Sequence, residues 1–226
     1  MSLPIFQPKY VGHFWDGKDW NFMPMTHRES DRALHFNYRV LETFNFPRRG
    51  GALVIACYDD WAMTMPLEDA LIQHNQIIYN ADESPFEANR IEMFIRRMNP
   101  AVVIGVSAGV LQGLTSMGHD PAQLFAGRTV WCRDFASYEQ LRAAEGIALR
   151  HWRQIGPAAA MECVAGAGLH VDAEEWQLET QDGEILVTNR LDRFPKIVRQ
   201  TTGLKGSIIH ECCTCGLPHP RVVLDN

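Results

Sequence analysis

Residues 101–109 read Ala101-Val102-Val103-Ile104-Gly105-Val106-Ser107-Ala108-Gly109 and predict a strand that turns directly into a helix. The first six residues form an unbroken apolar run with the length of a buried strand. The small residues and the serine that follow are typical of a helix start. We expect this helix to continue through Leu114.

The same alternation continues on both sides of this stretch. Apolar runs predict further strands over Ala52–Tyr58, Gln76–Tyr79, Arg128–Cys132 and Ala148–Trp152. Helix signals predict helices over Met65–His74, with Pro66 near its first turn, over Ser84–Met98 and over Ser137–Glu145. Strands and helices that alternate at this pitch predict an α/β fold with a mostly parallel sheet flanked by helices.

The pattern changes at Gly156-Pro157, after which we expect a smaller β subdomain. The runs Trp176–Thr180 and Glu184–Thr188 flank Asp182-Gly183, a dipeptide typical of a tight hairpin. We therefore divide the chain into an aromatic N-terminal segment with a first helix (1–50), an α/β subdomain (51–155) and the β subdomain (156–226). The first helix is predicted over Glu29–Phe44. The segment Phe14–Trp20 before it either lines a pocket or packs over an exposed sheet edge, and of the two we expect packing.

Composition limits the class of protein. The 226 residues are 46% hydrophobic and 21% charged, which is ordinary for a soluble globular chain with a substantial core. The formal net charge of -6 and the lack of a basic stripe argue against a nucleic-acid partner. No apolar run reaches the roughly 18 residues of a membrane helix. Six cysteines without a signal peptide favour a reducing compartment, so we expect a cytoplasmic protein.

Four residues in the last third have the chemistry of a metal site. Cys163 and His170 form one short pair, and Cys213 and Cys215 form a second pair after a segment rich in strand formers. Three thiolates and an imidazole are a complete tetrahedral ligand set for Zn²⁺, with no position open for water. The spacing is not that of a standard zinc finger, and buried free cysteines are the alternative.

The motif Gly105-Val106-Ser107-Ala108-Gly109 has the pattern of a nucleophile elbow, G-x-S-x-G, between a predicted strand and a predicted helix. Acids and histidines follow it in hydrolase order: Asp172, Asp182, Asp192, His210 and His219. The alternative is that Ser107 only caps the helix.

Four short motifs, in one order, resemble those of a known family. They are Gly156-Pro157 with Glu162-Cys163 and Gly168-Leu169-His170, Gly183–Thr188, Phe194-Pro195-x-Ile197 with Arg199–Gly203, and Cys213-x-Cys215-Gly216-x-x-His219-Pro220-Arg221. Together they resemble the phenylacetate–coenzyme A ligase branch of the adenylate-forming enzymes, which includes the coenzyme F390 synthetases. Members of this branch carry zinc at the positions that match Cys163, His170, Cys213 and Cys215. The resemblance therefore implies a structural zinc ion there, with Cys212 as a candidate substitute ligand.

The departures from the family bear on function. The chain has no Ser/Thr/Gly-rich loop for the ATP phosphates. The segment His151–Ile155 holds no carboxylate where the family has its catalytic acid, and Leu204 replaces the acid that binds ribose. The family's opening subdomain and its mobile C-terminal domain are also missing. We therefore expect a trimmed relative that does not adenylate.

Three functions remain open. The first is binding of a small aromatic or acyl acid, or of its coenzyme A thioester, in an inherited cleft near Trp61, Ser107, Trp131 and His151–Ala159. The second is acyl transfer or hydrolysis, with Ser107, His151 or Arg153 as catalytic residues. A guanidinium is suited to clamp a carboxylate, and an ordinary solvated arginine is the alternative for Arg153. The third is a structural or regulatory subunit. Apolar sheet surface left uncovered by the missing subdomain predicts a homodimer or a complementing subunit, unless the N-terminal segment covers it.

Overall fold

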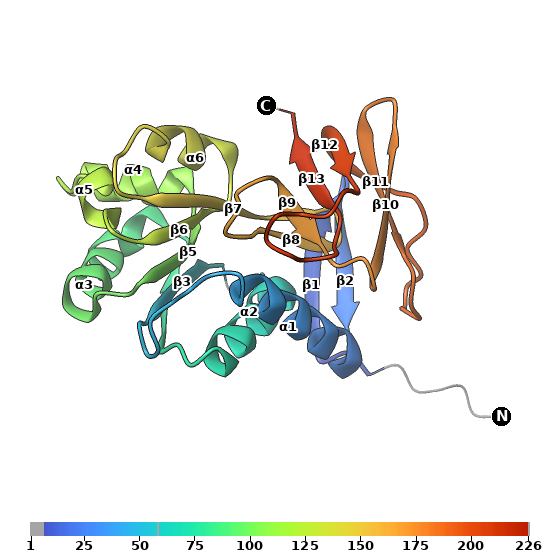
Figure 1. The fold of residues 1–226 in the computed structure, drawn as a ribbon, viewed down its shortest axis with the longest axis horizontal. Coiled ribbons are helices and arrows are strands. Elements are labelled where there is room, and N and C mark those ends of the chain that lie inside the picture. Colours follow the sequence, from blue (N-terminus) through green and yellow to red (C-terminus); the bar gives the residue numbers. More distant parts are fainter. Residues whose placement is uncertain (1–6, 58, 226) are drawn as a thin grey trace.

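A single large sheet organises the protein in the computed structural model, which describes residues 7–57 and 59–225 (Figure 1). Within this described part, eleven strands form one sheet. Their spatial order is β10 (Trp176–Gln181), β11 (Glu184–Asn189), β12 (Gln200–Ile209), β13 (Arg221–Leu224), β9 (Leu169–Val171), β8 (Ala158–Glu162), β7 (Ala148–Ile155), β6 (Thr129–Cys132), β5 (Val102–Val106), β3 (Ala52–Ala56) and β4 (Ile78–Asp82).

The strands from β4 to β7 pair in parallel, as the alternating pattern predicts. Helices cover both faces of this part because successive strand residues point to opposite sides. One face, with Val54 and Trp131, packs on α1 (His27–Leu41) and α2 (Trp61–Gln73). The other face, with Leu53 and Val130, packs on the remaining helices (Figure 1). These are η1 (Pro85–Glu87), α3 (Ala88–Met98), α4 (Ala108–Ser116), α5 (Pro121–Phe125) and α6 (Phe135–Leu141).

The remaining strand pairs, from β7 to β10, are antiparallel. The predicted hairpin is present: β10 and β11 are joined by Asp182 and Gly183, both at positive φ, which is the geometry of a type I′ turn. Strand β7 belongs to both parts of the sheet. It pairs with β6 on one side and with β8 on the other, so the change of pattern at Gly156 marks a turn inside one continuous sheet.

Several element boundaries differ from the sequence prediction. The strand expected through Tyr58 ends at Ala56, and Tyr58 itself lies outside the described residues, as do the first six residues and Asn226 of the expected end segments. Helix α2 begins at Trp61, four residues before the predicted start, so Pro66 lies within the helix and not near its first turn. Burial of Ala62 and Met63 against the core outweighs the local cost of the proline.

The N-terminal segment forms a hairpin of β1 (Tyr10–Trp15) and β2 (Trp20–Met25). Its inner side packs on a helix and not over the expected sheet edge: the partner is Ala62 of α2, which contacts Phe14, Met23 and Met25. Its outer side exposes aromatic rings.

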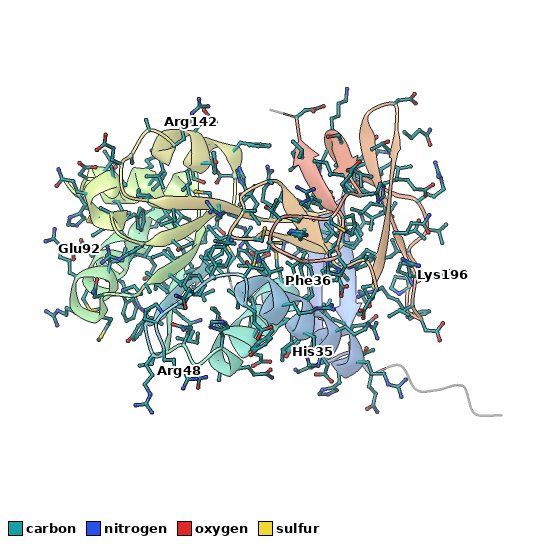
Figure 2. All side chains as sticks on the ribbon, viewed as in Figure 1. His35, Phe36, Arg48, Glu92, Arg142 and Lys196 are labelled. Carbon is teal, nitrogen blue, oxygen red and sulfur yellow. The ribbon has the colours of Figure 1, made fainter. Side chains whose placement is uncertain are left out.

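Helix α1 is fixed at its start by a capping box, in which the Thr26 side chain and Glu29 satisfy each other's backbone N–H groups. Figure 2 shows Phe36 and His35 on opposite sides of this helix, consistent with a buried Phe36 and an exposed His35. Among the described residues, no helix has both the length and the apolar character needed to cross a bilayer.

Candidate metal centre and ligand groove

The four predicted metal ligands meet at one point of the fold. Cys163 follows β8, His170 lies in β9, and Cys213 and Cys215 lie in the loop between β12 and β13. Strand β9 pairs with both β8 and β13, which brings together pairs that are far apart in the sequence. The four ligand atoms all lie within 4.8 Å of one another.

The distances suit a tetrahedral ion. The Sγ atoms of Cys163 and Cys213 are 3.7 Å apart, and Cys215 Sγ is 3.5 Å from His170 Nε2. A tetrahedron with Zn–S bonds of about 2.3 Å has edges of about 3.8 Å. His170 Nδ1 lies 3.1 Å from the backbone carbonyl oxygen of His219, a contact that holds the proton on Nδ1 and leaves Nε2 free as a ligand. This buried cluster can hold a metal ion.

The thiols of the cluster differ in their acidity. Burial raises the pKa of Cys163 to about 12. Burial also acts to raise the pKa of Cys213, but the backbone N–H of Cys215 and the neighbouring thiols outweigh it, and the net shift is downward. A metal ion that binds here must displace protons, so its affinity rises with pH. Cys212, the candidate substitute ligand, is exposed and is not part of the cluster.

His151 and Arg153 lie on one face of β7 and line a cavity of about 390 Å³, here called the β7 groove. In Figure 1, helix α6 and strand β13 are both drawn above β7. The groove is also lined by residues of α6, of the β8–β9 connection and of β13: Phe135, Tyr138, Glu162, Gly166, Ala167, Gly168, Leu169, Val222, Val223 and Leu224.

Arg153 is a cation without a hydrogen-bonding partner. Its guanidinium lies 4.4 Å from the ring centroid of Phe135. Among the described residues no group accepts a hydrogen bond from it, and its Nη1 atom is buried and unpaired. Burial lowers the pKa of Arg153, and the nearby charge of Asp134 opposes that shift. A guanidinium stays protonated at neutral pH, so this side of the groove carries a positive charge that no described side chain binds by a hydrogen bond.

His151 and Glu162 complete the polar part of the groove. The His151 ring stacks on Tyr138, with centroids 4.0 Å apart. Burial, with the charge of Arg153, lowers the pKa of His151 to about 4, so its ring is neutral at pH 7. The backbone N–H of His151 donates to Glu162 Oε2 at 2.7 Å, and burial raises the pKa of this carboxyl.

Ser107 occupies the N-cap of α4. Its Oγ accepts a hydrogen bond from the Val110 backbone N–H at 3.4 Å, and its side chain also bonds Glu83, which opposes the rise that burial causes in the Glu83 pKa. Within the described residues Ser107 contacts no histidine. His219 instead lies beside Asp172, with 3.7 Å between Nδ1 and Oδ1. The structure shows Ser107 as the N-cap of α4. Its role as a nucleophile stays a prediction.

The cleft expected near Trp61, Ser107 and Trp131 is filled at Trp131, whereas Trp61 lines a separate cavity of about 260 Å³ with residues of β3, α2 and β4. Trp131 and Trp152 are fully buried in the core between the sheet and the helices α1 and α2. The cavity on this face next to Gln154 and Ala159 has only about 30 Å³, room for no more than a water molecule or two. The cavity that His151 and Arg153 line is the β7 groove, on the face of the sheet opposite to Trp131.

Two groups of residues were missed by sequence reasoning. Glu162 reaches the groove because β8 pairs with β7, and the only sequence signal was its place beside Cys163 in a motif. A second group of potential metal ligands, Cys57, Asp60 and Glu83, gathers at the ends of the parallel strands. There Arg133 forms ion pairs with both Asp60 and Glu83, so a cation already occupies this group.

No protein-family model matches this sequence, and a comparison with curated proteins finds no match. Solved structures do match its fold. A 2-hydroxyisobutyryl-CoA ligase in an open conformation with 2-HIB-AMP and CoA gives a TM-score of 0.72 at 12% identity, over 97% of this chain and 53% of that one. A malonyl-CoA ligase in a ternary complex with methylmalonyl-CoA and AMP gives 0.57 at 13% identity, over 96% and 52%.

The amide bond synthetase McbA from Marinactinospora thermotolerans gives a TM-score of 0.54 at 11% identity, over 94% of this chain and 48% of that one. The chain thus spans about half the length of each of these structures. Its fold is similar to that of adenylate-forming acyl-CoA ligases.

Proposed function

We propose that the protein is a relative of the adenylate-forming CoA ligases that binds a small aromatic or acyl acid, or its CoA ester, without adenylating it. Arg153 carries this proposal, because a partly buried guanidinium that lines a groove and has no hydrogen-bond acceptor matches a carboxylate in charge and in shape. A volume of about 390 Å³ lies in the usual range of small-molecule sites. Phe135 and Tyr138 supply an aromatic wall for an apolar ligand body.

The same groove argues against adenylation. The phenylacetate–CoA ligase branch has its catalytic acid in the segment that matches His151–Ile155 of this chain. Here that segment holds Arg153 and no carboxylate. A fixed guanidinium there repels Mg²⁺. Leu204, at the position of the ribose-binding acid, packs against the apolar core of the antiparallel strands.

Isothermal titration calorimetry with aryl acids and acyl-CoA esters tests the binding. We expect the unmodified protein to bind at least one of them without ATP, and Arg153→Met to weaken that binding about tenfold or more, as expected for loss of a charge-assisted pair. The matched control is Arg142→Met. Arg142 lies at the end of α6 with 61% of its side chain exposed and points outward in Figure 2, so this variant keeps full affinity. Equal affinity in the unmodified protein and Arg153→Met contradicts the proposal, as does binding of ATP·Mg²⁺.

Zinc is the metal that the four-residue cluster favours, since three thiolates and one imidazole suit tetrahedral Zn²⁺. The site is closed, so its role is structural: it ties the β12–β13 loop to β8 and β9. Thiolate ligands require reducing conditions, which the cytoplasm provides. We expect about one zinc ion per chain. Cys213→Ser should lose the metal and loosen the loop, whereas Cys212→Ser should retain it; metal analysis and hydrogen exchange distinguish the two. Full zinc content in Cys213→Ser contradicts this assignment.

A non-catalytic, dimeric subunit is the second candidate, and the outer face of the β1–β2 hairpin favours it. Val11, Trp15, Trp20 and Phe22 lie there with 42% to 78% of their surface exposed. Apolar patches of this kind often mark contacts between chains. Sedimentation equilibrium of the unmodified protein and of Phe22→Ser with Trp20→Ser tests it: a dimer that the double variant separates supports this candidate, and a monomer at high concentration eliminates it.

A further inference from the structure

We infer that the ligand of the β7 groove is an aromatic acid with a second polar group, a hydroxyl or an amino group on the ring, and that Glu162 accepts a hydrogen bond from this group. The inference rests on the proposed acid binding at Arg153 and deepens it. It concerns the opposite end of the same groove.

The sheet register places a cation and an acid on one surface. Trp152 of β7 pairs with Met161 of β8, so His151 lies opposite Glu162. Arg153 is two residues from His151 and shares its face, about 7 Å along the strand. All three line the groove, and Arg153 and Glu162 do not form an ion pair in the described structure. A ligand in the groove therefore meets a positive group at one end and a carboxylate at the other.

Glu162 has hydrogen-bonding capacity to spare. Its side chain is held by the backbone N–H groups of His151 and Gly168; the charge of Arg150 acts on it from nearby, but no arginine or lysine among the described residues forms an ion pair with it. Two carboxylate oxygens offer about four acceptor positions, so about two remain. With 7% of its surface exposed, Glu162 is largely shielded from bulk water. A hydrogen bond to a carboxylate that is shielded from water is stronger than one in an open site, so a ligand that brings a donor to the remaining positions gains more here.

The walls between these two ends favour a flat ring. Phe135 and Tyr138 stand on the α6 side, with the Tyr138 ring stacked on His151. Leu169 and Val222 stand on the side of the antiparallel strands. An aromatic ring stacks on the first pair and packs on the second, and it also holds its two substituents at a fixed separation. A flexible aliphatic acid loses more conformational entropy to span the same two ends.

Calorimetry with benzoate, 4-hydroxybenzoate, 4-aminobenzoate and 4-methoxybenzoate tests the inference in the unmodified protein. The methoxy group matches the others in position but cannot donate. We expect the hydroxy and amino acids to bind about tenfold more tightly than benzoate and 4-methoxybenzoate. In Glu162→Gln this preference should fall to about twofold or less, while Glu139→Gln on the exposed side of α6 should keep it.

The outcomes separate the two proposals. If all four acids bind the unmodified protein equally and Arg153→Met still weakens them, the role of Glu162 is wrong and acid binding at Arg153 stands. If folded Glu162→Gln prefers the hydroxy and amino acids as strongly as the unmodified protein does, another group accepts the ligand's hydrogen bond, and the inference also fails. If no acid binds, or if Arg153→Met binds all of them as the unmodified protein does, the proposed function itself fails.

Discussion

Arg153 is held in place at some energetic cost. Leaving a guanidinium partly buried without hydrogen bonds is unfavourable, and the contact with the Phe135 ring returns only about 0.5–2 kcal/mol of this cost. An energetic cost without an evident structural gain is typical of a residue that binds a ligand. The neutral ring of His151, stacked nearby, keeps a second positive charge away from the guanidinium.

The acid stability of the protein depends in part on His151. Its pKa is about 4 in the folded protein and about 6.5 when unfolded, because burial and the charge of Arg153 disfavour the proton. As the pH falls from 6.5 towards 4, the unfolded chain takes up this proton and the folded chain does not, so the free energy of unfolding decreases. The loss is at most about 1.4 kcal/mol per pH unit, reduced by the partial exposure of the ring.

Urea denaturation over this pH window should therefore give a shallower pH dependence for His151→Gln than for the unmodified protein. Other groups, such as His219 with its pKa also lowered to about 4, titrate in both proteins and cancel in the comparison. Parallel curves for the two proteins would show that His151 is protonated normally in the fold.

Substitution of Ser107 distinguishes its role as a helix cap from a role as a nucleophile. As the N-cap of α4 it should stabilise the protein by about 0.5–2 kcal/mol, and Ser107→Ala should lose this amount. Because no histidine contacts it in the described structure, we expect the variant to hydrolyse aryl esters and thioesters no more slowly than the unmodified protein does. Hydrolysis that the unmodified protein catalyses and Ser107→Ala abolishes would restore the nucleophile.

Strands β5 and β3 lie very close to each other at Gly105. Gly105 has a φ of +93°, and a Cβ placed on it would lie 1.9 Å from the carbonyl oxygen of Ile55 in β3. Gly105→Ala should thus destabilise the protein by more than the roughly 1 kcal/mol of backbone strain alone. The control is Gly118→Ala, where φ is also positive at +82° but no atom lies within 4 Å of the added Cβ. Thermal unfolding should show a clearly larger loss for Gly105→Ala; equal losses would mean that β3 and β5 are farther apart.

The elements that were predicted from sequence are those with strong local signals. The apolar strands β3, β5 and β6 and the Asp182-Gly183 hairpin are examples, because a buried parallel strand and a type I′ turn each leave a compositional mark. Strands β8, β9, β12 and β13 were not predicted, since β9 has only three residues and β12 contains two glycines. Their pairing depends on distant partners, and this pairing also decides that Glu162 reaches the groove.

A buried network of charges joins helix α1 to the antiparallel part of the sheet. Arg193 lies 3.2 Å from Glu29 of α1 and 3.1 Å from Glu175, and all three side chains have at most 6% exposure. Removal of one partner from such a network leaves an uncompensated buried charge, which costs about 3–5 kcal/mol. Arg193→Met should therefore lower the free energy of unfolding by about this amount.

Arg199→Met is the control for this prediction, because Arg199 pairs with Glu179 at the surface with 49% of its side chain exposed. It should cost less than about 1 kcal/mol. Chemical denaturation of both variants measures the difference. A small loss in Arg193→Met would show that α1 is held to the antiparallel strands by apolar contacts alone.

The location of the cavity could be learned only from the whole molecule. The metal ligands and two groove residues, His151 and Arg153, were named from sequence, because the types and spacing of the residues suffice for that. The burial of Trp131 and Trp152 in the core depends on which strand faces meet which helices, and a linear pattern does not record this. The β7 groove consequently includes His151 and Arg153 of the residues named for the cleft, but lies on the face of the sheet opposite to Trp131.

The most direct test of acid binding in the β7 groove is a crystal structure of the protein soaked with 3-bromo-4-hydroxybenzoate, with the bromine located by anomalous scattering. We predict a bromine peak inside the groove between Phe135 and Val222, the carboxylate on the guanidinium of Arg153 and the ring hydroxyl on Glu162. A bromine peak on the α1–α2 face, near Trp61 and Trp131, or no peak in the groove of a fully soaked crystal, would contradict the account.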